Sequence, residues 1–151
     1  MDKFASVDSA LDFAISEEKK ASEFYTQLAS QVRGPGMRAV FTQFAAEEAA
    51  HRAKLEGVKA GRALLSSERR VKELSVTDYM TPRDTSPEMS YQDALLVVMQ
   101  KEKAAYRMYS DFAASAGDPA LRELFLSLSH EEANHKLRFE LEYDTFVSPE
   151  N

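Results

Sequence analysis

Two stretches of sequence decide how this chain folds: Glu47-Glu48-Ala49-Ala50-His51 and Glu131-Glu132-Ala133-Asn134-His135. Each contains the pattern Glu-x-x-His, and both copies lie at the same place in an internal repeat. Residues 10–56 align without a gap with residues 94–140, 84 positions later. Aligned identities outside the two stretches include Ala10 with Ala94, Leu11 with Leu95, Glu18 with Glu102, Tyr25 with Tyr109 and Phe41 with Phe125. Each half of the chain therefore offers one early Glu and a later Glu and His three residues apart.

Apolar residues recur at alternating spacings of three and four along four segments, which run from Val7 to Val32, Met37 to Val58, Tyr91 to Ala116 and Leu121 to Phe139. This period predicts four amphipathic helices packed in a bundle. Six residues that can bind metals lie inside the apolar stripes: Glu18, Glu48, His51, Glu102, Glu132 and His135. The sequence therefore predicts an all-α fold with these six side chains in its interior.

Turn residues divide the four helices into two pairs. Gly34-Pro35-Gly36 separates the first two helices, and Gly117-Asp118-Pro119 separates the last two. Asp118 is the expected N-cap of the fourth helix and Pro119 its first residue. Because such short connections join antiparallel neighbours, they predict two helical hairpins.

A longer connection joins the hairpins. We expect one domain over residues 1–151, with the first hairpin at about 6–65, a crossover at about 66–89 and the second hairpin at about 90–146. The crossover shows no sustained period, and Ser90 is the expected cap of the helix that follows it. Its basic run, Arg69, Arg70 and Lys72, is expected to form a solvated turn.

Four carboxylates in a helical core require compensation. An unpaired carboxylate that is removed from water costs several kcal/mol, so we expect a bound cation to offset the cost. Two divalent metal ions carry four positive charges, which balance four Glu, and two neutral His add nitrogen ligands. The ligand set therefore predicts a site for two metal ions.

Composition excludes several other classes of protein. The chain has no cysteine, which rules out disulfides, thiolate zinc sites and iron–sulfur centres within it. The net charge of −6 argues against a nucleic-acid partner. No signal segment and no apolar run of about 18 residues is present, so we expect a cytoplasmic protein with no membrane partner.

The pattern resembles the ferritin-like di-iron superfamily, and most closely the erythrin domain of rubrerythrin, from about Asp8 to about Tyr143. The most similar stretches are Glu18-Lys19-Lys20-Ala21-Ser22-Glu23-Phe24-Tyr25 and Phe44-Ala45-Ala46-Glu47-Glu48-Ala49-Ala50-His51. In that superfamily two helices provide one Glu each, two provide Glu-x-x-His, and a long crossover joins the pairs. The resemblance implies a ferritin-like antiparallel four-helix bundle made of two repeated hairpins.

The resemblance also implies roles for particular residues. All six candidates, Glu18, Glu48, His51, Glu102, Glu132 and His135, would be ligands of two iron ions, with manganese or zinc as alternative metals. Glu48 and Glu132 would bridge the two ions. Tyr25 and Tyr109 would hydrogen-bond the carboxylate ligands, although both could instead only fill the core.

The chain departs from rubrerythrin in two ways. It carries no rubredoxin module, so we expect a separate electron donor. Rubrerythrins also place a further Glu on the third helix, whereas the residues near Glu102 on that face are Val98, Met99, Ala105 and Tyr106. The ligand pattern is therefore closer to the symmetric one of bacterioferritin.

Other polar and aromatic residues receive simpler interpretations. Glu17, Glu47 and Glu131 are expected to be solvated or flanking charges, and His130, Glu56 and Glu140 to lie on helix surfaces. The phenylalanines Phe24, Phe41, Phe44, Phe112, Phe125 and Phe139 are expected to fill the core and keep the site dry.

Three functions remain open at this point. The first is a di-iron oxidoreductase of the rubrerythrin type, a peroxidase or oxidase whose reduced site reacts with hydrogen peroxide or oxygen. The second is a ferroxidase or an iron-binding, iron-buffering protein without turnover. The third is a structural bundle that holds zinc or manganese. We also expect a homodimer or larger homo-oligomer, in which the hairpins could be exchanged between chains.

Overall fold

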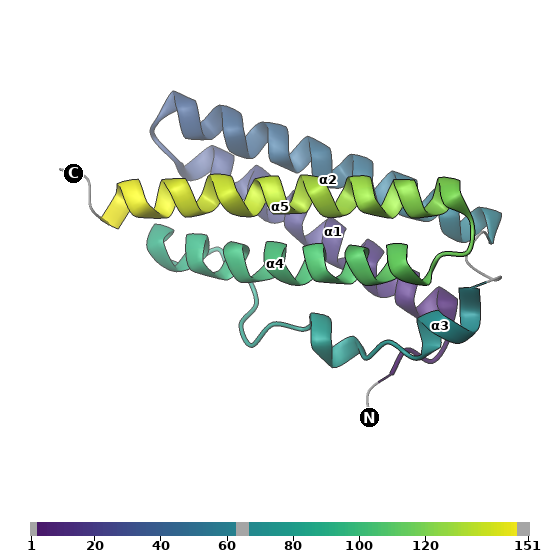
Figure 1. Ribbon diagram of the computed structural model, residues 1–151. Coiled ribbons are helices and arrows are strands. Elements are labelled where there is room, and N and C mark those ends of the chain that lie inside the picture. The colour runs from purple at the N-terminus through teal and green to yellow at the C-terminus, as the bar shows by residue number, and fades with distance from the viewer. Residues whose placement is uncertain (1–2, 63–66, 148–151) are drawn as a thin grey trace.

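A computed structural model describes residues 3–62 and 67–147, and this part of the chain is helical with no strand (Figure 1). Its elements are α1 (Val7–Gln31), α2 (Pro35–Gly61), α3 (Glu68–Lys72), the 3-10 helix η2 (Val76–Tyr79), α4 (Tyr91–Ser115) and α5 (Pro119–Val147). An isolated β-bridge joins Lys3 to Ser75. The predicted all-α class is therefore confirmed, and the four long helices are α1, α2, α4 and α5.

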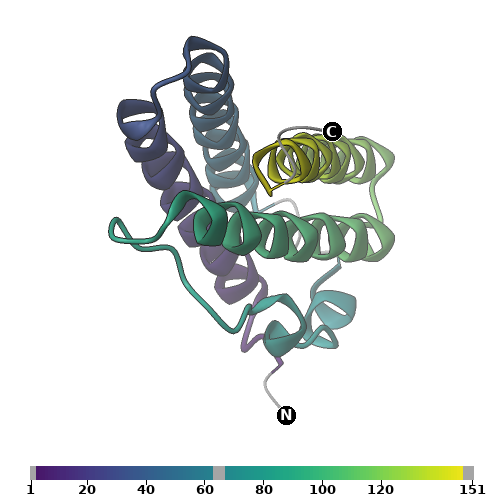
Figure 2. The ribbon, with the colours of Figure 1, turned by 90° about the vertical axis from the view of Figure 1, so that its left-hand side faces the viewer.

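The long helices pack in two pairs, α1 with α2 and α4 with α5. Figure 2 shows the α1–α2 pair on one side and the α4–α5 pair on the other. Local capping explains where α4 and α5 begin. The Ser90 side chain accepts a hydrogen bond from the Asp93 amide at 3.1 Å, and Asp118 accepts one from the Leu121 amide at 3.0 Å, as predicted. Pro119 is the first residue of α5.

The connection between the pairs contains more structure than the sequence predicts. The basic run Arg69, Arg70 and Lys72 is exposed to solvent as predicted, but it lies on the short helix α3, so the predicted turn is wrong. The reason is apolar anchoring, because Val71 and Tyr79 are buried and join the core. The predicted boundary at residues 65 and 66 lies outside the described residues.

The core consists of two apolar clusters separated by a polar layer. One cluster contains the start of α1, the end of α2, the end of α4 and the start of α5, including Leu11, Leu55, Phe112 and Phe125. The other contains the opposite ends of the same four helices, including Phe24, Phe41, Leu95 and Phe139. The middle of each helix lies between the two clusters. The six candidate ligands all come from these middle segments.

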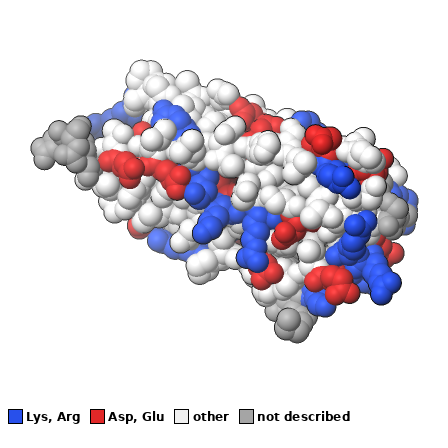
Figure 3. All heavy atoms as spheres, in the orientation of Figure 1, with Lys and Arg blue, Asp and Glu red and all other residues white. Residues whose placement is uncertain are grey.

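The exposed surface mixes both signs of charge. Acidic and basic side chains are interspersed on the face that α4, α5 and the crossover present, as Figure 3 shows. Among the described residues, no helix is long and apolar enough to cross a membrane.

Candidate metal centre

All six predicted ligands meet in the middle of the bundle. Glu18 on α1 and Glu102 on α4 are 2% exposed, while the Glu and His of α2 and of α5 are 1% exposed. Helix periodicity explains the convergence. A Glu and a His three residues apart lie on the same face of a helix, one turn from each other. Each helix thus presents its polar residues to the same layer without interrupting its apolar stripe.

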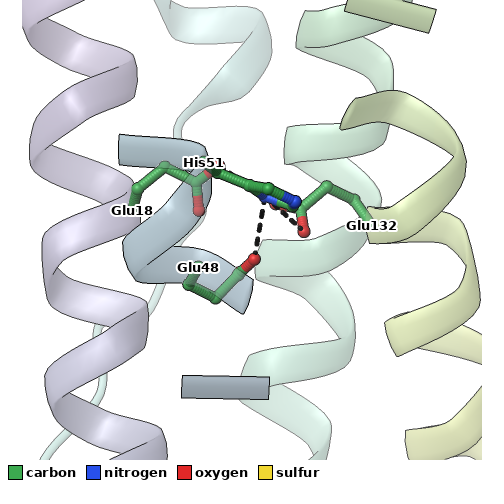
Figure 4. Close-up of side chains that lie close together, drawn as sticks. All are labelled: Glu18, Glu48, His51 and Glu132. Atoms are coloured by element: carbon green, nitrogen blue, oxygen red, sulfur yellow. Dashed lines mark hydrogen bonds and ion pairs between the residues drawn. The ribbon is translucent and has the colours of Figure 1, made fainter. Parts of the chain in front are cut away.

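The six side chains form two overlapping sets of four. Glu18, Glu48, His51 and Glu132 make one set, shown in Figure 4, and Glu48, Glu102, Glu132 and His135 make the other. Within each set, one ligand atom from every residue lies within 4.8 Å of the others. Glu48 and Glu132 belong to both sets. A chain that supplies its own two sets does not need a second copy to complete the centre, and the predicted oligomer stays a prediction.

Each imidazole directs Nδ1 at three carboxylates. His51 Nδ1 lies 3.1 Å from Glu48 Oε1, 3.2 Å from Glu18 Oε2 and 3.6 Å from Glu132 Oε1. His135 Nδ1 lies 3.3 Å from Glu102 Oε2, 3.4 Å from Glu132 Oε1 and 3.7 Å from Glu48 Oε1. The two rings are nearly parallel, at 13°, with centroids 6.4 Å apart. The carboxylate partners of the two rings are therefore equivalent residues of the sequence repeat.

Several atoms at the centre of this layer lack hydrogen-bond partners. Among the described residues, both oxygens of Glu48, Glu102 Oε2, Glu132 Oε1 and His135 Nδ1 are buried without one. Proteins rarely leave buried polar atoms unsatisfied, because each costs about 1–3 kcal/mol and more when charged. All five atoms are possible metal ligands that face one another. The residues present therefore fit a pair of metal ions.

Electrostatics point to the same conclusion. Burial raises the pKa of Glu48 well above its usual range, and the charges of Glu18 and Glu102 raise it further. Burial also raises the pKa of Glu132 well above its usual range, and the charges of Glu102, Glu18 and Glu48 add to this. Burial lowers the pKa of His51, but hydrogen bonding to Glu18 and the charges of Glu18 and Glu132 outweigh it and hold the pKa at about 9. Without metal, this layer therefore retains protons that a bound cation would replace.

Two tyrosines connect the halves of the centre. The Tyr25 hydroxyl donates a hydrogen bond of 2.7 Å to Glu102 Oε1, and the Tyr109 hydroxyl donates one of 2.5 Å to Glu18 Oε2. Each tyrosine therefore reaches the carboxylate of the other half of the repeat, although it lies seven residues after the Glu of its own half. Burial, together with nearby carboxylates, raises the pKa of both hydroxyls well above the usual range. Both stay protonated and remain donors.

Two further residues contact the centre and were not identified as such from the sequence. Glu131 Oε1 lies 3.1 Å from His51 Nε2, and Glu47 Oε1 lies 2.8 Å from His135 Nε2. Each side chain is partly exposed, as expected for a flanking charge, but it also binds the imidazole of the opposite helix. The signal was available, because the repeat aligns Glu47 with Glu131. What the helical period could not show is that these residues reach across to the other hairpin.

The remaining predicted residues lie around this layer. His130 and Glu56 are exposed and Glu140 is half-buried, and none of the three belongs to either set of four. Of the six phenylalanines, Phe44 is partly exposed, and its ring stacks on His135 with centroids 3.9 Å apart. Tyr106 is 43% exposed and therefore does not share the inner face with Glu102.

Comparison with known proteins identifies the family. No curated protein and no solved structure gives a significant match to this chain. The family model described as rubrerythrin matches residues 9–143, a range that includes α2, α4, most of α1 and α5, and every residue of the two sets. The chain therefore belongs to the rubrerythrin family.

Proposed function

We propose that the chain binds two iron ions through Glu18, Glu48, His51, Glu102, Glu132 and His135, and that it is an oxidoreductase acting on hydrogen peroxide or oxygen. The observation that carries this proposal is the pair of four-ligand sets that share Glu48 and Glu132. Each set would hold one ion, and Glu48 and Glu132 would be available to both ions.

The outer carboxylates prepare the imidazoles for metal binding. A carboxylate can only accept, so Nε2 of each His carries the proton that it donates to Glu131 or Glu47. In the neutral ring, Nδ1 then has a free lone pair directed at the shared carboxylates. Such an acid-to-histidine contact orients the ring and increases its basicity as a ligand. Glu47 and Glu131 therefore act as positioning residues.

Charge balance favours divalent ions. Four ionised Glu carry four negative charges, and two divalent ions neutralise them without help from the neutral imidazoles. Histidine and carboxylate ligands accept iron, manganese and zinc alike, so family membership is what favours iron here.

When bound, a pair of ferrous ions supplies the two electrons that convert hydrogen peroxide and two protons into two molecules of water. The protein contributes a largely buried site, because an apolar cluster lies on either side of the polar layer. Tyr25 and Tyr109 hold protons at hydroxyls that touch Glu102 and Glu18. A separate reductant is needed to return the electrons.

Anaerobic loading with ferrous ion, followed by rapid mixing with hydrogen peroxide or with oxygen, tests this function. We expect absorbance changes on mixing and repeated turnover when a reductant is present. Oxidation of the iron without turnover would instead assign the protein to iron oxidation and buffering. A metal-loaded protein that reacts with neither oxidant would contradict the proposal and favour a structural role for the metal.

A further inference from the structure

A small cavity leads from the centre towards the surface between α1 and α4. Its volume is about 40 Å³, and the buried residues that line it include Glu18, Glu48, Glu102, Tyr25 and Tyr109. Its more exposed polar lining residues are Glu17 and Lys20 on α1, Lys101 on α4, and Asp84 and Thr85 in the crossover. The cavity thus joins the carboxylate side of the centre to a group of charged side chains. On the imidazole side, Glu47 and Glu131 contact the two rings.

Four of these charged residues form a closed ring of ion pairs. Lys101 Nζ lies 3.1 Å from Asp84 Oδ1 and 3.6 Å from Glu17 Oε1. Lys20 Nζ lies 3.4 Å from Glu17 Oε2 and 3.9 Å from Asp84 Oδ2. Each cation therefore contacts both anions, and the ring has no net charge. Figure 2 shows the crossover passing across α1 before it joins α4, which is how Asp84 reaches both helices.

The repeat shows that this ring is a point of divergence between the halves. Glu17 and Lys101 occupy equivalent positions, 84 residues apart, and each directly precedes a predicted ligand. The six candidate ligands and the two tyrosines at the centre align with identical residues, whereas Glu17 and Lys101 carry opposite charges and pair with each other. Lys101 is also only 20% exposed, low for a lysine, because Asp84 and Glu17 hold it at the cavity.

We propose that the cavity is an entrance to the metal centre and that a ring of ion pairs, which we call the latch, holds it closed. The latch consists of Glu17, Lys20, Asp84 and Lys101. The entrance admits small uncharged oxidants and excludes larger reductants. This inference rests on the proposed function. A cavity of 40 Å³ has room for roughly three waters, enough for hydrogen peroxide or dioxygen. An organic reductant does not fit, so electrons reach the centre through the protein. A metal ion that enters through this cavity passes the Lys101 ammonium group, so we expect it to enter when the Asp84–Lys101 pair opens.

The rate of metal uptake measures this opening without relying on turnover. We would mix metal-free protein with cobaltous ion and follow the cobalt absorbance by stopped flow, for wild type, Asp84→Asn and Lys101→Gln. The matched control is Asp12→Asn. The Asp12 side chain is 56% exposed, against 61% for Asp84, and its Oδ1 lies 2.6 Å from Lys59 Nζ. Neither Asp12 nor Lys59 lines the cavity. Final stoichiometry and thermal unfolding would be recorded for every variant.

The two variants separate a latch from a simple effect of charge. If the ring is a latch, both substitutions accelerate uptake, by about two- to fivefold for an ion pair of this exposure, and Asp12→Asn does not. If only charge at the mouth matters, loss of the lysine accelerates cobalt uptake and loss of the aspartate slows it. Three results would each contradict the proposed entrance and leave the proposed function intact: opposite changes in uptake rate for the two variants, unchanged rates, or equal acceleration by Asp12→Asn. Failure of the wild-type protein to bind metal would overturn both.

Discussion

The polar layer and the two apolar clusters beside it are stabilised in opposite ways. The clusters bury aromatic and aliphatic side chains, such as Phe125 and Phe139, and contribute to folding whether or not metal is present. The layer buries four carboxylates and two imidazoles, with several atoms unpaired. The same four helices build both regions. The comparison shows that apolar packing holds the scaffold, and we expect the layer to depend on a bound cation.

The largest effect should come from damage to a cluster. Phe125 is fully buried, so Phe125→Ala should lower the free energy of unfolding by about 3–5 kcal/mol, from lost burial and the cavity left behind. The loss should be similar with and without metal. Urea unfolding measures it, and Leu137→Ala on the same helix, where Leu137 is 55% exposed, is the control. A loss confined to the metal-loaded protein would contradict the division into two regions.

Metal should stabilise the protein through the layer. At a free metal concentration of about 100 times the dissociation constant, binding to one site adds about 2.7 kcal/mol to the free energy of unfolding. For a chain of this size that corresponds to a rise of roughly 5–10 °C in Tm. Differential scanning calorimetry with and without ferrous or manganous ion tests the expectation. An unchanged Tm at saturating metal would argue against a buried site.

Substitution of Glu47 or Glu131, which contact the imidazoles, should have a smaller effect and should change only the affinity for metal. Glu47→Gln and Glu131→Gln should each weaken metal binding by about 10- to 100-fold, because each orients one imidazole. The control is Glu56→Gln, since Glu56 is exposed and belongs to neither set of four. Competition with a chelator of known affinity measures the change. Affinity equal to that of the wild type would show that the contacts with His51 and His135 are incidental.

The stability of the metal-free protein should change gradually with pH. The pKa of His51 is about 9 in the metal-free fold against an ordinary value of 6.5, so its favourable contribution is complete below pH 6.5 and is lost as pH rises through 9. Glu48 and Glu132 have raised pKa values, so the folded state holds protons that the unfolded state releases near pH 4.5. Both effects make the metal-free protein less stable as pH rises.

Metal binding should reverse this dependence. Ligands must lose their protons to bind a metal, so the affinity increases with pH. We therefore expect the Tm values of metal-free and metal-loaded protein to diverge between pH 5 and pH 9, with each group contributing at most about 1.4 kcal/mol per pH unit. If the two plots of Tm against pH stayed parallel over this range, the conclusion that the metal-free layer holds protons would be wrong.

The sequence predicted the layer well and its surroundings less well. The helical period placed Glu18, Glu48 and His51 on inner faces, because position along a helix determines which face a residue occupies. It could not show that Tyr25 and Glu47 contact residues of the other hairpin, because such contacts depend on how the hairpins pack. The helical segment at Arg69 and Arg70 was missed because it is stabilised by anchoring to the core, and five residues carry too little periodicity to detect.

The number of metal ions per chain tests the central claim most directly. Purified protein is loaded anaerobically with ferrous ion, freed of excess metal and analysed by elemental analysis, beside Glu48→Ala and Glu132→Ala. We predict two ions per chain for the wild type and the loss of at least one ion in each variant, because both sets of four share these two carboxylates. Full binding of two ions by both variants, or no binding by the wild type, would contradict the account.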